Sequence, residues 1–192
     1  MRYILFILLL VIVISCDLFK TRNPEQPSDN NVIFIPPTEP QILISNFKNS
    51  IENLNSENYI KCLYNDNNNP FIFFPSQSIN SSLFSIFQNW NINDERRFIN
   101  TLNSISNNNK PQLTWVNNKS IIENPDSAIY ESGYLLNINV NDKNISGNYS
   151  GNLRLILITD KQGYWYISRW YDFSNTLDSN NNWSFLKAKL SN

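Results

Sequence analysis

The sequence predicts an α+β domain in which helices pack against one face of an antiparallel sheet. After residue 38, apolar residues recur first at helical spacing. From residue 111 onward the period changes to two, and each strand-like run has one apolar and one polar face. Short breaks that contain Asn or Gly separate these runs. Helices followed by a meander of long strands are typical of this fold class.

Several helical segments precede the long strands. Thr38 to Gln41, "TEPQ", fits a capping box, and an apolar stripe follows, made of Leu43, Phe47, Ile51 and Leu54. Ser56 is the candidate N-cap of a second, short helix. After a short apolar strand, "PFIFFP", the segments "SSLFSIFQNW" and "NDERRFINTLNSI" are also predicted to be helical. The last of these is expected to begin at an Asn93 cap.

Long strand-like runs fill the second half of the chain. They span Pro111–Asn117, Ser127–Asn141, Ile145–Thr159 and Tyr164–Phe173. The polar connections 141–144 and 160–163 have the composition of hairpin turns. One face of the second run carries Tyr130, Tyr134, Leu136, Ile138 and Val140. We expect such apolar faces to line the interior of the domain.

Alternation in the last run, "GYWYISRWYDF", assigns its side chains to two faces. One face would carry Trp165, Ile167, Arg169 and Tyr171. The other face would carry Tyr166, Ser168, Trp170 and Asp172. Asp172 would therefore point away from the interior unless a β-bulge intervenes, because one extra residue reverses the alternation.

The N-terminus has the pattern of an exported, lipid-anchored protein. Arg2 precedes an apolar run from Tyr3 to Ile14, which is short for a membrane span but suits the core of a signal peptide. The run leads into Val13-Ile14-Ser15-Cys16, which resembles the bacterial lipobox. The resemblance implies removal of residues 1–15 and attachment of acyl chains such as palmitate to Cys16. An uncleaved N-terminal anchor is the alternative.

Residues 16–37 are the predicted tether, and residues 38–192 are the predicted domain. The tether contains several prolines and no regular period, whereas "VIFI" at 32–35 is more apolar than a free linker needs. We expect this short stretch to lie against the domain. The lipid anchor would make the membrane a partner and place the domain at the bacterial cell envelope, outside the cytoplasm.

Charge and residue types restrict the possible functions. The chain has 15 Lys and Arg against 16 Asp and Glu, a net charge of −1, and so lacks the basic footprint of a nucleic-acid-binding protein. It has no His, which excludes Ser–His–Asp and Cys–His catalysis and leaves zinc without its usual ligands. We expect no metal and no other cofactor. If Cys16 carries lipid, Cys62 has no disulfide partner, and its apolar neighbours favour a buried thiol over a reactive one.

Several segments together resemble the nuclear-transport-factor-2-like (SnoaL-like) superfamily. They are "ILISNFKNSIENLNSENYIKCL", "FIFFP", "DSAIYESGYLLNINV", "GNLRLILITD" and "GYWYISRWYD", the last with a W-x-I element at 165–167. The resemblance spans about Thr38 to Leu190. It implies a cone-shaped fold, in which a strongly curved antiparallel sheet wraps the N-terminal helices around a pocket. It also implies that the outer face of the sheet can form a homodimer.

Within such a cone the candidate pocket residues are Trp115, Tyr130, Tyr134, Arg169 and Tyr171. Because Arg is rarely buried alone, Arg169 would either meet an anionic ligand group at the mouth or pair with an interior carboxylate. We expect non-catalytic binding of a small amphipathic ligand and assign no catalytic residue. A solidly packed interior would favour a dimerising protein-interaction module. A buried carboxylate hydrogen-bonded to a pocket Tyr would favour an isomerase- or dehydratase-like enzyme.

Overall fold

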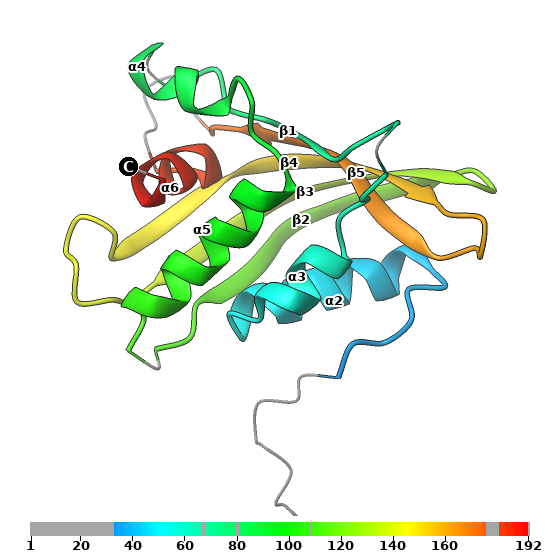
Figure 1. Ribbon diagram of the computed structural model, residues 1–192, viewed down its shortest axis with the longest axis horizontal. Helices are drawn as coiled ribbons and strands as arrows, with labels where there is room; N and C mark the ends of the chain where they lie inside the picture. Colours follow the sequence, from blue (N-terminus) through cyan, green and yellow to red (C-terminus); the bar gives the residue numbers. More distant parts are fainter. Residues whose placement is uncertain (1–32, 67, 80, 108, 176–180, 192) are drawn as a thin grey trace, which may run out of the picture. The chain divides into compact units, whose positions relative to one another are not determined.

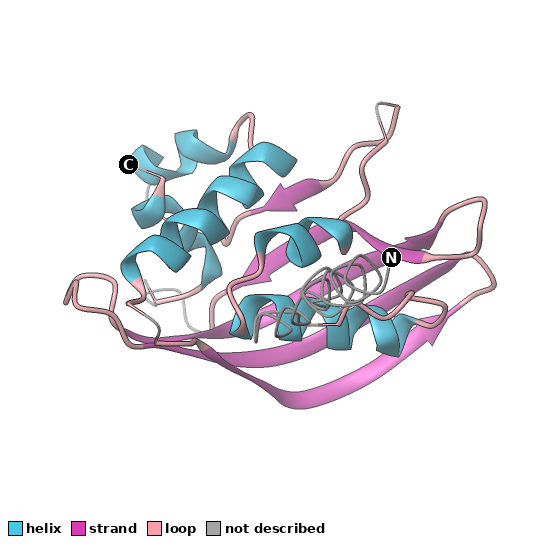
Figure 2. Ribbon diagram, turned by 60° about the horizontal axis from the view of Figure 1, so that its bottom comes forward, coloured by secondary structure: helices cyan, strands magenta, loops and turns pink. Residues whose placement is uncertain are grey.

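The domain is built on a curved five-stranded sheet whose concave side is covered by helices (Figures 1 and 2). The computed structural model describes residues 33–66, 68–79, 81–107, 109–175 and 181–191. The strand order is β1-β5-β4-β3-β2. The strands are β1 (Ile72–Phe74), β2 (Gln112–Glu123), β3 (Ser127–Ile138), β4 (Gly147–Thr159) and β5 (Trp165–Phe173). The four long strands are antiparallel, as predicted, whereas β1 pairs with β5 in parallel and makes the sheet mixed.

The helices are α2 (Pro40–Glu52), α3 (Ser56–Lys61), α4 (Ser81–Phe84), α5 (Ile92–Ile105) and α6 (Trp183–Leu190), with a 3₁₀ turn η2 (Ser85–Phe87). The predicted capping box at 38–41 is wrong, because the N-cap of α2 is Glu39 and makes no side-chain capping bond. The cap of α3 is Asn55, one residue before the predicted Ser56. A capping box does open α5, but it joins Asn91 and Asp94 instead of starting at Asn93.

The C-terminal helix α6 was not predicted as a helix, and it packs into the interior. Asn182 caps it by accepting a hydrogen bond from the backbone N–H of Phe185. Six of its eight residues are buried, and Trp183 makes edge contacts with Trp170 and Phe98. The ring of Trp170 in turn contacts Phe47 and Phe73 at centroid distances of 5.3 and 5.2 Å. Aromatic side chains therefore pack the interior around α6.

A β-bulge at Ser168 overturns the predicted faces of the last strand. Arg169 lies opposite Ile156 and Ile167 lies opposite Leu157, so Ser168 is an extra residue in β5. Before the bulge, Trp165 and Ile167 point inward as predicted. After it the alternation reverses, and the inward residues are Trp170 and Asp172. Arg169 and Tyr171 consequently lie on the outer face, contrary to prediction.

The segment that enters the domain, 33–37, lies against it, as expected for the "VIFI" stretch. The side-chain amide of buried Asn46 donates to the carbonyl of Ile35, and its carbonyl accepts from the Ile35 N–H. Two residues later, the Pro37 carbonyl accepts from the N–H of Trp165. The predicted signal peptide and Cys16 lie outside the described residues. Within the described part of the chain, no helix is long and apolar enough to cross a membrane.

Candidate functional site

A buried ion pair between Glu95 and Lys187 lies inside the cone. Both side chains are 0% exposed, and Lys187 Nζ lies 2.5 Å from Glu95 Oε1. The indole N–H of Trp90 donates to the same oxygen at 2.8 Å, and the hydroxyl of Tyr59 donates to Oε2 at 2.6 Å. Each oxygen of the Glu95 carboxylate therefore has a protein donor, as a buried charge requires.

Aromatic rings surround the ammonium of Lys187. Its Nζ lies 3.6 Å from the centroid of Phe73 and 3.8 Å from that of Trp170, which are cation–π distances. Burial lowers the pKa of Lys187 to about 8, and the negative charge of Glu95 opposes this effect. The ammonium is thus held by one carboxylate and two ring faces.

A second buried cluster joins β3, β5 and α6 through Asp172. The hydroxyl of Tyr134 donates to Asp172 Oδ1 at 2.7 Å, and the N–H and hydroxyl of Ser184 donate to Oδ2 at 2.9 and 2.6 Å. Tyr134 crosses β4 at Gly151, where an added Cβ would lie 2.7 Å from the Tyr134 hydroxyl oxygen. Glycine therefore leaves the space in which the phenol reaches β5. Burial raises the pKa of Asp172, and these hydrogen bonds oppose the rise.

Both clusters are closed and saturated. Asp172 and Tyr134 are each 2% exposed, and the same Tyr134 hydroxyl accepts from the N–H of Trp183. A substrate proton could reach either carboxylate only after α6 had moved, since Lys187 and Ser184 both come from that helix. In this arrangement the clusters anchor α6 to the sheet and to α5.

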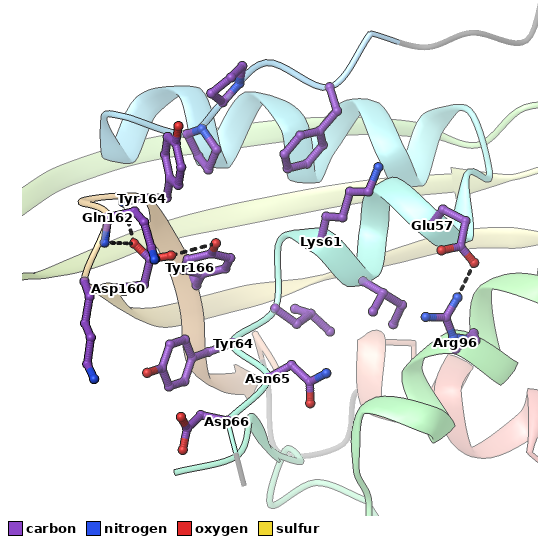
Figure 3. Close-up of a pocket in the computed structure, with 16 residues that line it drawn as sticks. Glu57, Lys61, Tyr64, Asn65, Asp66, Arg96, Asp160, Gln162, Tyr164 and Tyr166 are labelled. Atoms are coloured by element: carbon purple, nitrogen blue, oxygen red, sulfur yellow. Dashed lines mark hydrogen bonds and ion pairs between the residues drawn. The ribbon is translucent and has the colours of Figure 1, made fainter. Parts of the chain in front are cut away.

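An open cavity lies outside the Glu95 and Asp172 clusters, and we call it the α3–hairpin groove. Its volume is about 820 Å³. It lies between the entering segment, α3 with the residues that follow it, and the hairpin that joins β4 to β5 (Figure 3). Its lining consists of Phe34, Pro36, Pro37, Glu57, Ile60, Lys61, Leu63, Tyr64, Asn65, Asp66, Arg96, Asp160, Lys161, Gln162, Tyr164 and Tyr166.

Local pairing at the edge of β5 builds the wall of this groove. Tyr64 N–H donates to the carbonyl of Ile167, and Ile167 N–H donates to that of Cys62, so the chain after α3 adds a short bridge beside β5. The rings of Tyr64 and Tyr166 then meet edge to face at 5.8 Å. Asp160 holds the hairpin by accepting from the Tyr166 hydroxyl at 3.0 Å. Burial, with this bond, raises the pKa of Tyr166 to about 12.

The structure separates the five predicted pocket residues. Trp115 and Tyr130 lie on the inner face, with ring centroids 5.8 Å apart, and Tyr134 lies deeper, in the Asp172 cluster. Tyr171 stacks on Phe74 on the outer face. None of the five belongs to the lining of the α3–hairpin groove.

Neither role expected for Arg169 matches its position. It lies outside the cone, where its guanidinium donates to the carbonyls of Pro70 and Ser168 and to the side-chain oxygen of Asn69. These acceptors are neutral, so it is not paired with an interior carboxylate. The bulge at Ser168 is the physical cause.

Cys62 is a buried thiol. It is 0% exposed, its Sγ donates to the carbonyl of Asn58, and burial raises its pKa. The interpretation as a buried apolar thiol is therefore confirmed, because a reactive cysteine needs access and a lowered pKa. Among the described residues, no group of three or more Cys, Asp or Glu side chains is arranged to hold a metal ion.

Comparisons with solved structures identify the fold. No protein-family model matches the sequence, and no curated protein sequence matches it. A nuclear-transport-factor-2-like superfamily protein from Salmonella enterica superposes with a TM-score of 0.55 at 12% identity, over 70% of this chain and 87% of that one. A putative scytalone dehydratase from Novosphingobium aromaticivorans gives 0.55 at 8% identity, over 71% and 81%. A conserved protein from Planctomyces limnophilus gives 0.54 at 7% identity, over 69% and 91%. The domain thus has the nuclear-transport-factor-2-like fold.

Proposed function

We propose that the protein is a lipid-anchored cell-envelope protein whose domain binds a small amphipathic ligand, without catalysis, in the α3–hairpin groove. The observation that carries this proposal is an open groove of about 820 Å³, whereas the Glu95 and Asp172 clusters inside the cone are buried. A cavity of this size, with apolar and aromatic walls and a few polar groups, suits a small molecule.

The composition of the groove supports an amphipathic ligand. Phe34 and Ile60 supply apolar surface. Tyr64, Tyr164 and Tyr166 supply aromatic surface (Figure 3). Polar groups of Asn65 and Gln162 lie beside them. Aromatic rings with few rotatable bonds give large contact area at low entropic cost.

The Asp172–Tyr134 pair meets one criterion for an isomerase- or dehydratase-like enzyme, but its setting does not support that function. A general base must reach the substrate proton directly or through one water. Here Tyr134 and Ser184 already occupy both carboxylate oxygens, and α6 covers the pair. We therefore place the ligand outside the cone.

An uncharged probe tests the groove. We expect 4-phenylbutanamide to shift the backbone amide NMR signals of Tyr64 and Tyr166, and Tyr64→Ser to weaken binding about tenfold, because the loss of one ring removes much of the apolar contact. Tyr171→Ser, a matched change on the outer face, should leave the affinity unchanged. Shifts confined to residues outside the groove, or an equal effect of both variants, would contradict the proposal.

The anchor is tested separately. Cells grown with an alkyne-bearing fatty acid should label the wild-type chain and the Cys62→Ser variant, whereas Cys16→Ser should lose the label. Cys62 is the matched control because it is the other cysteine of the chain. An unlabelled wild type would favour the uncleaved anchor, and label that persists in Cys16→Ser would show that Cys16 is not the lipidated residue.

A homodimer through the outer sheet face is a second candidate, favoured by exposed apolar side chains there. They are Phe74, Val116, Leu135 and Phe173, on four different strands. We expect sedimentation velocity to show a dimer that Leu135→Lys converts to a monomer. Phe84, on α4, is about as exposed as Leu135, so Phe84→Lys is the matched control and should leave the dimer intact. A monomeric wild type would exclude this candidate.

A further inference from the structure

We infer that the α3–hairpin groove selects ligands with an anionic group, which Lys61 holds. This inference rests on the proposed function and names the charge of the ligand at that same site. It follows from which charged groups of the lining already have partners and which do not.

The lining has three carboxylates, Glu57, Asp66 and Asp160, and each accepts from a protein donor. Asp66 Oδ1 accepts from the backbone N–H of Asn68. Glu57 is paired with the guanidinium of Arg96. Asp160 Oδ1 accepts from the backbone N–H groups of Gln162 and Tyr164, and its Oδ2 accepts from the Tyr166 hydroxyl. The hydrogen bonds of Asp160 stabilise the hairpin and direct its charge toward protein donors. These carboxylates therefore offer little to a cationic ligand.

The lysines of the groove, unlike its carboxylates, have no hydrogen-bond or ion-pair partner among the described residues. Within the described part of the chain, neither Lys61 nor Lys161 has a carboxylate partner or a hydrogen-bond acceptor. Elsewhere, the ammonium groups of Lys48, Lys110, Lys187 and Lys189 each have an oxygen partner. The exposed Lys143, on the β3–β4 connection, has none among the described residues, but it does not border the groove. Two lysines that have no oxygen partner among the described residues therefore border one cavity.

Lys61 is the better placed of the two. It lies at the end of α3, where the partial negative charge of the helix favours a cation, and its Nζ lies 5.6 Å from the centroid of Phe34. Figure 3 shows its side chain extending from α3, with Tyr164 and Tyr166 across the groove from it. A ligand whose apolar body lay against the tyrosines could bring an anionic head to this ammonium. Carboxylates, sulfonates and phosphate esters share that chemistry.

Three probes with one body and different heads test the inference. 4-Phenylbutyrate is anionic, 4-phenylbutanamide is neutral and 4-phenylbutylammonium is cationic. We expect the wild type to bind the anion about fivefold more tightly than the amide, which is the size expected of a partly exposed ion pair. The cation should bind more weakly than the amide. The preference for the anion should decrease as salt is raised from 20 to 300 mM (roughly 20 Å to 6 Å of screening length).

Matched variants separate the inference from the proposed function. Lys61→Gln should abolish the preference for the anion while leaving the affinity for the amide unchanged. Lys143→Gln changes an exposed lysine on the β3–β4 connection and should alter neither affinity. Equal binding of anion and amide by the wild type, or a preference that survives Lys61→Gln, would overturn the role of Lys61 even though the groove binds the amide. Failure of all three probes to bind would overturn the groove itself.

Discussion

Lys187 and Lys61 are two lysines beside aromatic rings, and their surroundings differ in almost every other respect. Lys187 lies inside the cone, 3.6 Å from the centroid of Phe73, with Glu95 as its ion-pair partner and no exposed surface. Lys61 lies 5.6 Å from the centroid of Phe34, at the rim of an open groove, and is exposed. The first lysine completes the protein's own interior. The second has charge available for another molecule.

This difference shows that a buried ionisable group with a shifted pKa is not by itself evidence of a functional site. Perturbed groups gather at active sites, but structural ion pairs perturb pKa values as well. In the interior, each carboxylate oxygen already accepts a bond from the protein. In the groove, Lys61 and Lys161 have no oxygen partner among the described residues. Incomplete pairing next to an open cavity is the stronger indication of a binding site.

The same substitution at the two lysines should give the largest contrast. We expect Lys187→Met to lower the free energy of unfolding by about 3–5 kcal/mol, because it leaves the Glu95 carboxylate buried without its cation. Urea titration of a fragment of residues 33–192 would measure the loss. The double variant Lys187→Met/Glu95→Gln should recover most of it, because replacing both charges removes the stranded one. A double variant as unstable as Lys187→Met would show that packing, not charge, is the cause.

The Asp172 cluster should respond more weakly. Tyr134→Phe removes the donor to Asp172 and the acceptor of the Trp183 N–H, at an expected cost of about 1–3 kcal/mol. Tyr171→Phe is the control on the outer face and should change stability by less than about 0.5 kcal/mol. The comparison of interior and surface would be wrong if the two hydroxyl deletions had equal effects.

The pH dependence of stability tests the charge of Lys187. Its pKa is about 8 in the folded protein and 10.5 ordinarily, so between these values the unfolded chain binds the additional proton. The free energy of unfolding must then rise with pH between 8 and 10.5. The stability gained by deprotonating Lys187 is lost as pH falls through 8. We expect the wild type to gain about 1–2 kcal/mol relative to Lys187→Met/Glu95→Gln between pH 8 and 9.5. Unlike Met, the neutral amine still donates a hydrogen bond to Glu95, and it avoids the cost of burying the ammonium. A relative loss over this range would mean that burial does not lower this pKa.

The smallest effect is expected in the groove. Lys61→Met should change the free energy of unfolding by less than about 0.5 kcal/mol, because the ammonium is exposed and has no ion-pair partner among the described residues. Thermal or urea unfolding of Lys61→Met and Lys187→Met under the same conditions would compare the two losses of stability. A loss above about 2 kcal/mol would place Lys61 with the structural lysines.

The sequence predicted the elements of the fold better than it predicted the site. Helical and two-residue periodicity located α2, α5 and the long strands. When one face of a helix or strand is buried, apolar residues recur at the spacing of that element, and this spacing is visible in the sequence. The bulge at Ser168 leaves no comparable signal, since a single extra residue looks like ordinary alternation until pairing with Ile156 and Leu157 is known. That residue alone moved Arg169 and Tyr171 out of the predicted pocket.

The groove could not be read from the sequence for a different reason. Its walls come mainly from three segments, 34–37, 57–66 and 160–166, and Arg96 of α5 adds to them. The three segments are far apart in the chain and meet through hydrogen bonds at the edge of β5. The interior clusters depend on long-range contacts too, since Glu95 and Lys187 are 92 residues apart. The apolar residues Trp183, Leu186 and Leu190 were the available signal that α6 is buried, whereas Lys187 and Lys189 indicated an exposed segment.

The bonds between Asn46 and Ile35 determine where a mechanical pull would enter the domain. If the chain is tethered at its N-terminus, tension arrives at residue 33 and first loads this single side chain and the Pro37–Trp165 bond. Such local contacts open at lower free energy than the core. Because Phe34, Pro36 and Pro37 form one wall of the groove, their release would dismantle the binding site while the sheet stayed folded. Force on the tether and occupancy of the groove would then oppose each other, and a bound ligand would strengthen the attachment of the domain to its own anchor.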